Sequence, residues 1–317
     1  MIQNSKFDIR RDTDLVITGT IGLDDIETPF GKVEKTLGGS GVYAAMAASY
    51  FASPRLGSRR GKPGLVSIAG NDLSDKHVKT LEKIDTSGVT KTGKTFHWAG
   101  FYEFDMNEAQ TKQTDLNSLA GYRPVVPDKY KKAGYLFLAN IDPDIQLEVL
   151  AQMKSMPFVV LDTMNYWITS KKEILKSVIA KVDILVMNEG EARQFCATPN
   201  LIRAGRQLLE LGPKYVIIKK GEHGALLFGH NTFFSAPGYP LEEVKDPTGA
   251  GDSFAGGLIG YLAKTDDVSE QNIRKGIIYG SVVASFCAEE FGLKYLENIK
   301  NTDIKERYEF VKKIRRF

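Results

Sequence analysis

A glycine-rich turn that ends in a carboxylate stands out in the last quarter of the chain. Residues 246–252, here named the anion turn, read Asp-Pro-Thr-Gly-Ala-Gly-Asp and lead into an apolar stretch with helical character. Gly249 and Gly251 permit a sharp turn whose N–H groups converge, and the beginning of a helix adds partial positive charge. Asp252 can accept the proton of an attacking hydroxyl there. The turn therefore suits phosphoryl transfer, and a helix cap formed by Asp252 is the simpler alternative.

The composition of the chain argues against several classes of protein. Its 317 residues include 42 basic and 39 acidic side chains, and the net charge of +3 is too balanced for a nucleic-acid-binding surface. No uninterrupted apolar stretch approaches the roughly 20 residues of a membrane span, and residues 1–14 lack the apolar core of a signal peptide. Cys196 and Cys287 offer neither metal-ligand spacing nor a disulfide framework. We expect a cytoplasmic protein that acts on small molecules and binds neither nucleic acid nor membrane.

Short apolar runs alternate with helical patterns over most of the chain. The runs do not alternate with polar residues, which is typical of strands covered on both faces in a parallel sheet. They lie at residues 15–17, 64–68, 135–138, 158–161, 184–187 and 215–218. Helical patterns cover residues 41–51, 75–83, 144–153, 171–180, 189–196 and 201–211, and further helices are expected at 252–264, 270–290 and 303–314. This order predicts an α/β fold with mostly parallel strands.

Two segments break this rhythm, residues 18–36 and about 95–118. They are rich in threonine, aromatic and charged residues, and the second alternates with the period of two that half-exposed antiparallel strands show. We expect these two insertions to form a small sheet that covers the active site as a lid. Its aromatic residues, Phe96, Trp98, Phe101, Tyr102 and Phe104, would then either stack on a nucleobase or pack the lid on itself or on a second subunit.

The anion turn closely resembles the C-terminal signature of the ribokinase-like (PfkB) carbohydrate kinases, Asp-Thr-x-Gly-Ala-Gly-Asp, with Pro247 as the departure. The resemblance implies that Asp252 is the general base and that the backbone of Gly249, Ala250 and Gly251 forms an anion hole. It also implies a three-layer ribokinase-like fold, with a mainly parallel central sheet and a small β-sheet lid. We expect residues 1–317 to form a single kinase domain of this kind.

Other stretches resemble further motifs of the family in the expected order, from about residue 14 to 295. Residues 37–44 resemble the N-terminal Gly-Gly signature, and residues 19–24 resemble the exit of the first strand, whose aspartate binds substrate hydroxyls. Asp25 stands next to Asp24, and the sequence does not choose between them with certainty. The position of Asn140 at a predicted strand end adds it to the cleft. The substrate-binding residues are therefore predicted to be Asp24, Gly38, Gly39, Ser40, Tyr43 and Asn140.

Two more motifs resemble the nucleotide-binding half of the family. Residues 188–191 resemble the Asn-x-x-Glu motif associated with Mg²⁺ and phosphates, and residues 217–225 resemble the nucleotide-binding strand and turn. The resemblance implies ATP and Mg²⁺, with Glu191 acting on the metal, directly or through water. The ATP-binding residues are predicted to be Asn188, Glu191, Lys219, Gly221, Gly224 and Thr248. Related kinases also bind a monovalent cation such as K⁺ through backbone carbonyls, here those of residues 246–248 and 284–292, and many form homodimers through the lid.

Several of these residues have simpler structural explanations. Asn188 and Glu191 suit the start of a helix, and Lys219 and Lys220 could be one buried stem and one exposed charge. Ribokinases carry Lys and Asn where this chain has Ser40 and Tyr43, which argues against free ribose as the substrate. We expect a sugar or nucleoside kinase, and the alternative is a catalytically silent sugar- or nucleoside-binding regulatory protein on the same fold.

Two other kinds of nucleotide-binding protein fit the sequence poorly. Gly39-Ser40-Gly41-Val42-Tyr43-Ala44 has the spacing of a dinucleotide-binding fingerprint, G-x-G-x-x-A. However, the residues before it make a poor buried strand, and the following 20 residues lead into a loop instead of a strand that ends in an acidic residue. A P-loop motif is absent from the sequence. Hydride transfer and P-loop kinase chemistry are therefore disfavoured.

Overall fold

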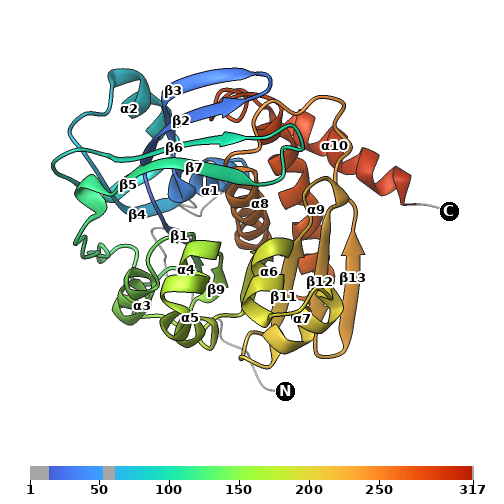
Figure 1. The fold of residues 1–317 in the computed structure, drawn as a ribbon. Helices are drawn as coiled ribbons and strands as arrows, with labels where there is room; N and C mark the ends of the chain where they lie inside the picture. The colour runs from blue at the N-terminus through green and yellow to red at the C-terminus, as the bar shows by residue number, and fades with distance from the viewer. Residues whose placement is uncertain (1–13, 53–60, 316–317) are drawn as a thin grey trace.

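The computed structural model describes residues 14–52 and 61–315. Within them, nine strands form the central sheet in the order β13-β12-β11-β10-β9-β8-β1-β4-β5 (Figure 1). Seven neighbouring strands, from β11 to β5, run parallel, and β12 and β13 add an antiparallel hairpin at one edge. In chain order the bounds are β1 Leu15–Thr18, β4 Gly64–Ala69, β5 Asp85–Lys91, β8 Tyr135–Leu138, β9 Phe158–Leu161, β10 Ile184–Asn188, β11 Tyr215–Lys219, β12 Ala225–Gly229 and β13 Thr232–Ala236.

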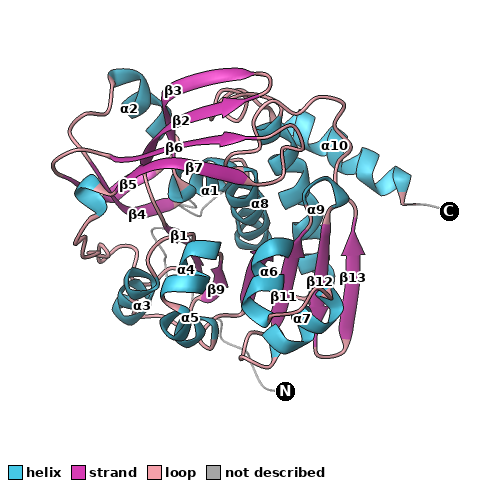
Figure 2. Cartoon of the chain, in the orientation of Figure 1, coloured by secondary structure: helices cyan, strands magenta, loops and turns pink. Residues whose placement is uncertain are grey.

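Helices cover both faces of this sheet (Figure 2). One layer contains α1 Ser40–Ser49, α2 Asp75–Leu81, α8 Ala250–Thr265, α9 Glu270–Ala288 and α10 Asn301–Ile314. The other contains α3 Pro143–Gln152, α4 Asn165–Ser170, α5 Lys172–Ile179, α6 Glu189–Cys196 and α7 Leu201–Leu209. The predicted three-layer α/β architecture is confirmed. Among the described residues, no helix is both long enough and apolar enough to cross a bilayer.

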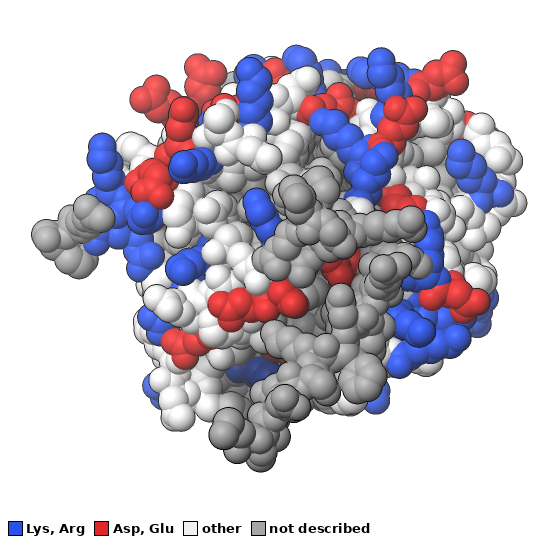
Figure 3. Space-filling model, turned by 180° about the vertical axis from the view of Figure 1, so that it is seen from behind, with Lys and Arg blue, Asp and Glu red and all other residues white. Residues whose placement is uncertain are grey.

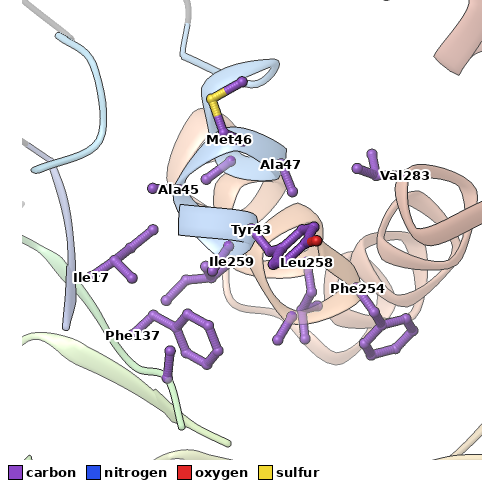
Figure 4. Close-up of a cluster of buried hydrophobic side chains, with 14 of the residues drawn as sticks. Ile17, Tyr43, Ala45, Met46, Ala47, Phe137, Phe254, Leu258, Ile259 and Val283 are labelled. Atoms are coloured by element: carbon purple, nitrogen blue, oxygen red, sulfur yellow. The ribbon is translucent and has the colours of Figure 1, made fainter. Parts of the chain in front are cut away.

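The two core clusters explain why the strand sequences are continuously apolar. Val16 packs into the cluster beneath α5, α6 and α7, and its neighbour Ile17 packs into the cluster beneath α1, α8 and α9. Leu185 and Val186 divide in the same way. Figure 4 shows part of the cluster beneath α1, α8 and α9, where Ile17 and Phe137 of the sheet face side chains of α1 and α8. Both faces of each strand are buried, so alternation with polar residues is absent.

A second sheet, here named the small sheet, has four strands in the order β3-β2-β6-β7 and lies across one end of the central sheet (Figure 1). Its strands are β2 Gly22–Thr28, β3 Gly31–Gly38, β6 Phe96–Tyr102 and β7 Ala109–Asp115. The expected antiparallel pairing is found within each hairpin, but β2 and β6 pair in parallel. An all-antiparallel sheet is therefore a wrong expectation, because each insertion folds as its own hairpin and the two hairpins join along strands that run in the same direction.

Acidic and basic side chains are interspersed on the face of the molecule opposite to the view of Figure 1 (Figure 3).

On the small sheet, Phe104 is 85% exposed, at the turn between β6 and β7, and β7 itself is almost wholly exposed. A homodimer that buries the exposed surface of the small sheet stays a prediction.

Candidate active site

The anion turn leads directly into α8, and its geometry depends on Gly249. Gly249 is the N-cap of α8 with a φ of 75°, in the left-handed region that glycine adopts without strain. No described side chain caps the helix at this end. The first turn of a helix leaves N–H groups without partners inside the helix, and these groups carry partial positive charge. The half-buried side chain of Asp252 lies in this same first turn, as predicted.

Asp246 fixes the other end of the anion turn. Its carboxylate is fully buried and accepts hydrogen bonds from the N–H of Thr248 at 2.9 Å and from the N–H of Gly292 at 3.0 Å. Burial raises the pKa of Asp246, and the two backbone N–H groups oppose that rise. The sequence marked Asp246 as the start of a motif, whereas the structure shows it joining the turn to the segment that follows α9.

Lys219, at the end of β11, brings charges from three other elements together. Its Nζ atom donates a hydrogen bond to Oδ2 of Asp162 at 2.8 Å. The same Nζ would lie 3.0 Å from a Cβ atom built on Gly251, so the ammonium group reaches the anion turn. Although burial lowers the pKa of Lys219, the carboxylates of Asp162 and Glu191 raise it above its ordinary value. The lysine therefore remains charged within an acidic cluster.

The carboxylates of this cluster have raised pKa values mainly because they are buried. Burial raises the pKa of Asp252 to about 7, the charge of Asp162 adds to the shift, and Lys219 opposes it. Burial also raises the pKa of Glu191, whose side chain is 8% exposed, although Lys219 lowers it. A carboxylate with a pKa near neutrality suits a general base, because it takes up a proton readily at the working pH.

Asp24 lies on β2, on the face of the small sheet that is turned inward. It is 4% exposed, and burial raises its pKa to about 8, with the charge of Asp246 as the next cause. A Cβ atom on Gly38 would come within 1.9 Å of Oδ2 of Asp24, so the carboxylate packs directly against the Gly-Gly turn. Asp25 points to the opposite face, where it accepts from the N–H of Lys35 at 2.6 Å and contacts Nε2 of His97 at 3.1 Å. Of the two aspartates, Asp24 is thus the one that faces the site.

The aromatic residues of the small sheet divide between its two faces. Trp98 pairs with Asp24 in the β2–β6 register, and Phe96 and Tyr102 have the same orientation as Trp98 because side chains alternate along a strand. Phe101 points to the other face, beneath the Nζ atom of Lys112 at 4.9 Å from its ring centre. The sequence identified this aromatic group but not which members share a face with Asp24.

Ser40, Asn140 and Tyr43 have protein neighbours that the sequence did not reveal. The hydroxyl of Ser40 accepts from the N–H of Thr20 at 3.0 Å and donates to the carbonyl of Asn140 at 2.6 Å. The side chain of Asn140 accepts from the indole N–H of Trp167 at 3.0 Å. Tyr43 is 1% exposed, and its hydroxyl finds no hydrogen-bond partner among the described residues. Direct contact of these three residues with substrate stays a prediction, and their observed role is to hold the walls of the site.

Asn188 and Glu191, two of the residues predicted to bind ATP, form a capping box at the start of α6. The N–H of Glu191 donates to Oδ1 of Asn188 at 2.8 Å, and the N–H of Asn188 donates to Oε2 of Glu191 at 2.7 Å. A capping box is the simpler explanation considered from the sequence. It is compatible with a second role, because Glu191 also belongs to the acidic cluster around Lys219.

The turn after β11 contains Gly221 and Gly224, with φ of 53° and 83°. A Cβ on Gly224 would come within 2.0 Å of the carbonyl of Ala236, so a larger residue cannot fit there.

Two of the carbonyl groups considered for a monovalent cation already have protein partners. The carbonyl of Ala288 accepts from the N–H of Lys245 at 2.9 Å, and that of Thr248 lies 3.4 Å from the thiol of Cys287. Within the described ranges, no group of three or more His, Cys, Asp or Glu side chains is arranged to hold a metal ion. Binding of a monovalent cation stays a prediction.

A sequence profile of the pfkB family of carbohydrate kinases matches residues 24–299. The chain belongs to the pfkB family. It is 30% identical to a cytidine kinase of Thermococcus kodakarensis over 255 residues, which cover 78% of this chain and 88% of that protein. As a member of this family, the protein is a phosphotransferase with an alcohol group as acceptor, of the sugar or nucleoside kinase class.

Solved structures agree with this assignment at the level of the fold. The nucleoside kinase of Methanocaldococcus jannaschii is 19% identical, with a TM-score of 0.73 over 94% of this chain and 98% of that chain. The ribokinase of Arabidopsis thaliana, solved with ribose and ATP, is 19% identical, with a TM-score of 0.72 over 93% of this chain and 98% of that chain. The pfkB protein therefore has a ribokinase-like fold, with the anion turn at the start of α8 and the small sheet beside it.

Proposed function

We propose that the protein is an ATP-dependent nucleoside kinase that phosphorylates a primary hydroxyl of the sugar. The observation that carries the choice of a nucleoside over a free sugar is the register of the small sheet, in which Trp98 lies beside Asp24 on the same face. A carboxylate accepts hydrogen bonds from sugar hydroxyls, and an indole ring on the neighbouring strand offers a stacking surface for a base. The relative named a cytidine kinase agrees with this choice.

The proposed chemistry centres on Asp252. Its carboxylate takes the proton of the acceptor hydroxyl while the hydroxyl oxygen forms a bond to the γ-phosphorus of ATP and the bond to the bridging oxygen breaks, so that ADP leaves. The N–H groups at the start of α8 would stabilise the charge on the moving phosphoryl group, an effect of about 3–4 kcal/mol for a well-placed donor. Lys219, held at 2.8 Å from Asp162, would add positive charge beside this turn.

The carboxylates near Lys219 also fit a magnesium ion bound with ATP. Mg²⁺ keeps several waters and uses one or two protein carboxylates together with substrate phosphates, so it does not need a site built from three acidic side chains. Burial raises the pKa of Glu191, and a cation beside this carboxylate would favour its charged form. Bound Mg²⁺ neutralises phosphate charge during transfer. Glu191, directly or through water, is the residue that we assign to hold it.

A substrate panel tests the proposed function. The assay measures ADP formation with cytidine, uridine, adenosine, inosine, ribose, fructose and 2-deoxyribose as acceptors. We expect a nucleoside to be phosphorylated with a kcat/KM about 10–100-fold above that of ribose, because stacking of a base contributes roughly 1–3 kcal/mol. Preference for ribose or a hexose would contradict the choice of substrate. Tight binding of a nucleoside without any ADP formation would instead support the silent regulatory alternative.

A pair of variants separates the base-stacking surface from the rest of the small sheet. Trp98→Ala should raise the KM for the nucleoside by about 10–100-fold while leaving the KM for ATP unchanged. Phe101→Ala is the matched control, since Phe101 lies on the same strand but on the opposite face. Equal effects of the two substitutions would argue that Trp98 acts only by supporting the sheet.

A further inference from the structure

The small sheet contacts the anion turn through two hydroxyl groups. At the end of β6, the hydroxyl of Thr248 donates a hydrogen bond to the phenol oxygen of Tyr102 at 3.2 Å. At the end of β2, the hydroxyl of Thr28 donates to the carbonyl of Lys245 at 2.9 Å. Lys245 and Thr248 lie on either side of Asp246, so both contacts hold the segment that enters α8. The sheet and the turn therefore form one hydrogen-bonded unit, although Tyr102 and Thr248 are 146 residues apart in sequence.

Thr248 is well placed to transmit the position of the sheet to the turn. Its N–H is held by Oδ1 of Asp246, and the next residue, Gly249, is the N-cap of α8. Its side chain is the group that reaches out of the turn toward the small sheet. A shift of Tyr102 would change the orientation of Thr248, and through it the direction of the N–H groups at the start of α8.

Strand β6 carries both Trp98, the proposed stacking residue, and Tyr102, which contacts the anion turn. Trp98 and Tyr102 are four residues apart and on the same face of the strand, a separation of about 13 Å along it. After Tyr102 the chain turns toward α6, where a Cβ atom on Gly190 would lie 3.3 Å from Oε1 of Glu108. One hairpin thus carries Trp98 and contacts both the anion turn and α6.

We propose that Tyr102 is a positioning residue for phosphoryl transfer, which acts through its hydrogen bond with Thr248 to orient the anion turn when an acceptor holds the small sheet in place. The proposal rests on the kinase function proposed above. It explains how the turn discriminates against water: a water molecule at the reacting centre is too small to reach Trp98 as well, so it cannot hold β6 and Tyr102 in the position that orients the turn. Transfer to the acceptor is then favoured over hydrolysis of ATP.

The test compares Tyr102→Phe, Thr248→Val and the double variant, with Thr248→Ser as the conservative replacement that keeps the hydroxyl. Three quantities are measured: kcat for transfer, the KM values for ATP and nucleoside, and the rate of ATP hydrolysis without acceptor. Tyr102→Phe and Thr248→Val should each lower kcat by about 10-fold, as expected for one lost hydrogen bond that acts in the transition state, and should raise the ratio of hydrolysis to transfer. The double variant should be no worse than either single variant, and Thr248→Ser should retain most activity.

Specific results would overturn the proposal. Wild-type kcat and an unchanged hydrolysis ratio in Tyr102→Phe would show that the phenol oxygen does not position the turn. Effects that multiply in the double variant, or a loss in Thr248→Val confined to the KM for ATP, would show that the two residues act independently. Phe101→Leu serves as the control for general damage to β6, and thermal unfolding checks each variant. If Tyr102→Phe does not fold, the contrast between Thr248→Val and Thr248→Ser decides. A wild-type protein without transfer activity would instead refute the proposed function.

Discussion

The ring of Tyr43 packs directly beneath Gly249, and a Cβ atom on that glycine would lie 2.4 Å from the ring. The same ring lies 3.4 Å from the position of a Cβ on Gly38. One buried side chain in the first turn of α1 therefore supports both the Gly-Gly turn and the anion turn, and Figure 4 shows it pointing from α1 toward α8. The distance between Gly38 and Gly249 therefore depends on core packing around Tyr43.

Gly249→Ala should therefore be far more damaging than its φ alone implies. A non-glycine residue in the left-handed region costs roughly 1–2 kcal/mol, and here the new methyl group also meets the immobile ring of Tyr43. We expect activity to fall by more than about 100-fold and the midpoint of urea unfolding to decrease. Gly93→Ala is the matched control, because Gly93 has a φ of 61° and nothing within 4 Å of its Cβ position. Similar losses in both variants would show that the φ effect, and not the contact with Tyr43, dominates.

Lys219→Met should destabilise the protein because it leaves the buried carboxylates of Asp162 and Glu191 without a cation. Breaking a buried ion pair from one side costs about 3–5 kcal/mol, which can be measured as a loss in the free energy of unfolding in urea. The double variant Lys219→Met/Asp162→Asn should recover part of this loss. Lys220→Met, one residue along the chain, should have little effect. A double variant as unstable as the sum of the two single variants would contradict the pairing.

Activity should have an acidic limb near neutrality. The base must be deprotonated to act, and the pKa of Asp252 is raised to about 7 from its ordinary 3.8. The kcat/KM for the nucleoside should therefore increase about 10-fold per pH unit below this value and level off above it. A limb near pH 4 would contradict the raised pKa of the base.

The free energy of unfolding without ligand should decrease as the pH rises, whereas activity increases. Asp252 and Asp24 keep their protons in the folded state up to about pH 7 and 8, whereas the unfolded chain loses them near 3.8. The stabilisation that their protonated forms provide is complete below pH 3.8 and is lost as the pH rises through 7 and 8. Asp24→Asn should flatten this dependence in urea unfolding between about pH 4 and 8.

Much of the fold could be predicted from residue patterns, and the exceptions have physical reasons. The runs at 135–138 and 158–161 coincide with β8 and β9, because strands buried on both faces must be apolar throughout. Strand β5, residues 85–91, escaped prediction because it lies at the edge of the sheet and is polar, so it resembles a loop. The hairpin of β12 and β13 was also missed, since the apolar run of β12 follows the glycine turn too closely to be separated from it by pattern alone.

The sequence predicted a set of residues for the candidate site but not the contacts that the structure shows among them. Glycines and carboxylates at motif spacing pointed to the anion turn and to the pair Asp24 and Asp25, because their backbone and charge requirements are local, and the structure then showed that Asp24 is the one turned inward. The partner of Lys219 could not be read from the sequence, since Asp162 is 57 residues away and meets it only through the order of the strands. Whether Ser40 faces substrate or protein depends on its hydrogen bonds with Thr20 and Asn140, which only the packed structure shows.

The central claim, that Asp252 is the base of a phosphoryl-transfer site, is tested most directly by Asp252→Asn, which removes the proton acceptor and keeps the shape of the side chain. Single-turnover transfer and ATP binding should be measured on the same folded protein with a nucleoside that the wild type phosphorylates. We predict a loss of about 10²–10⁴-fold or more in the transfer rate, with the dissociation constant for ATP changed by less than about threefold. Transfer at near the wild-type rate would contradict the account.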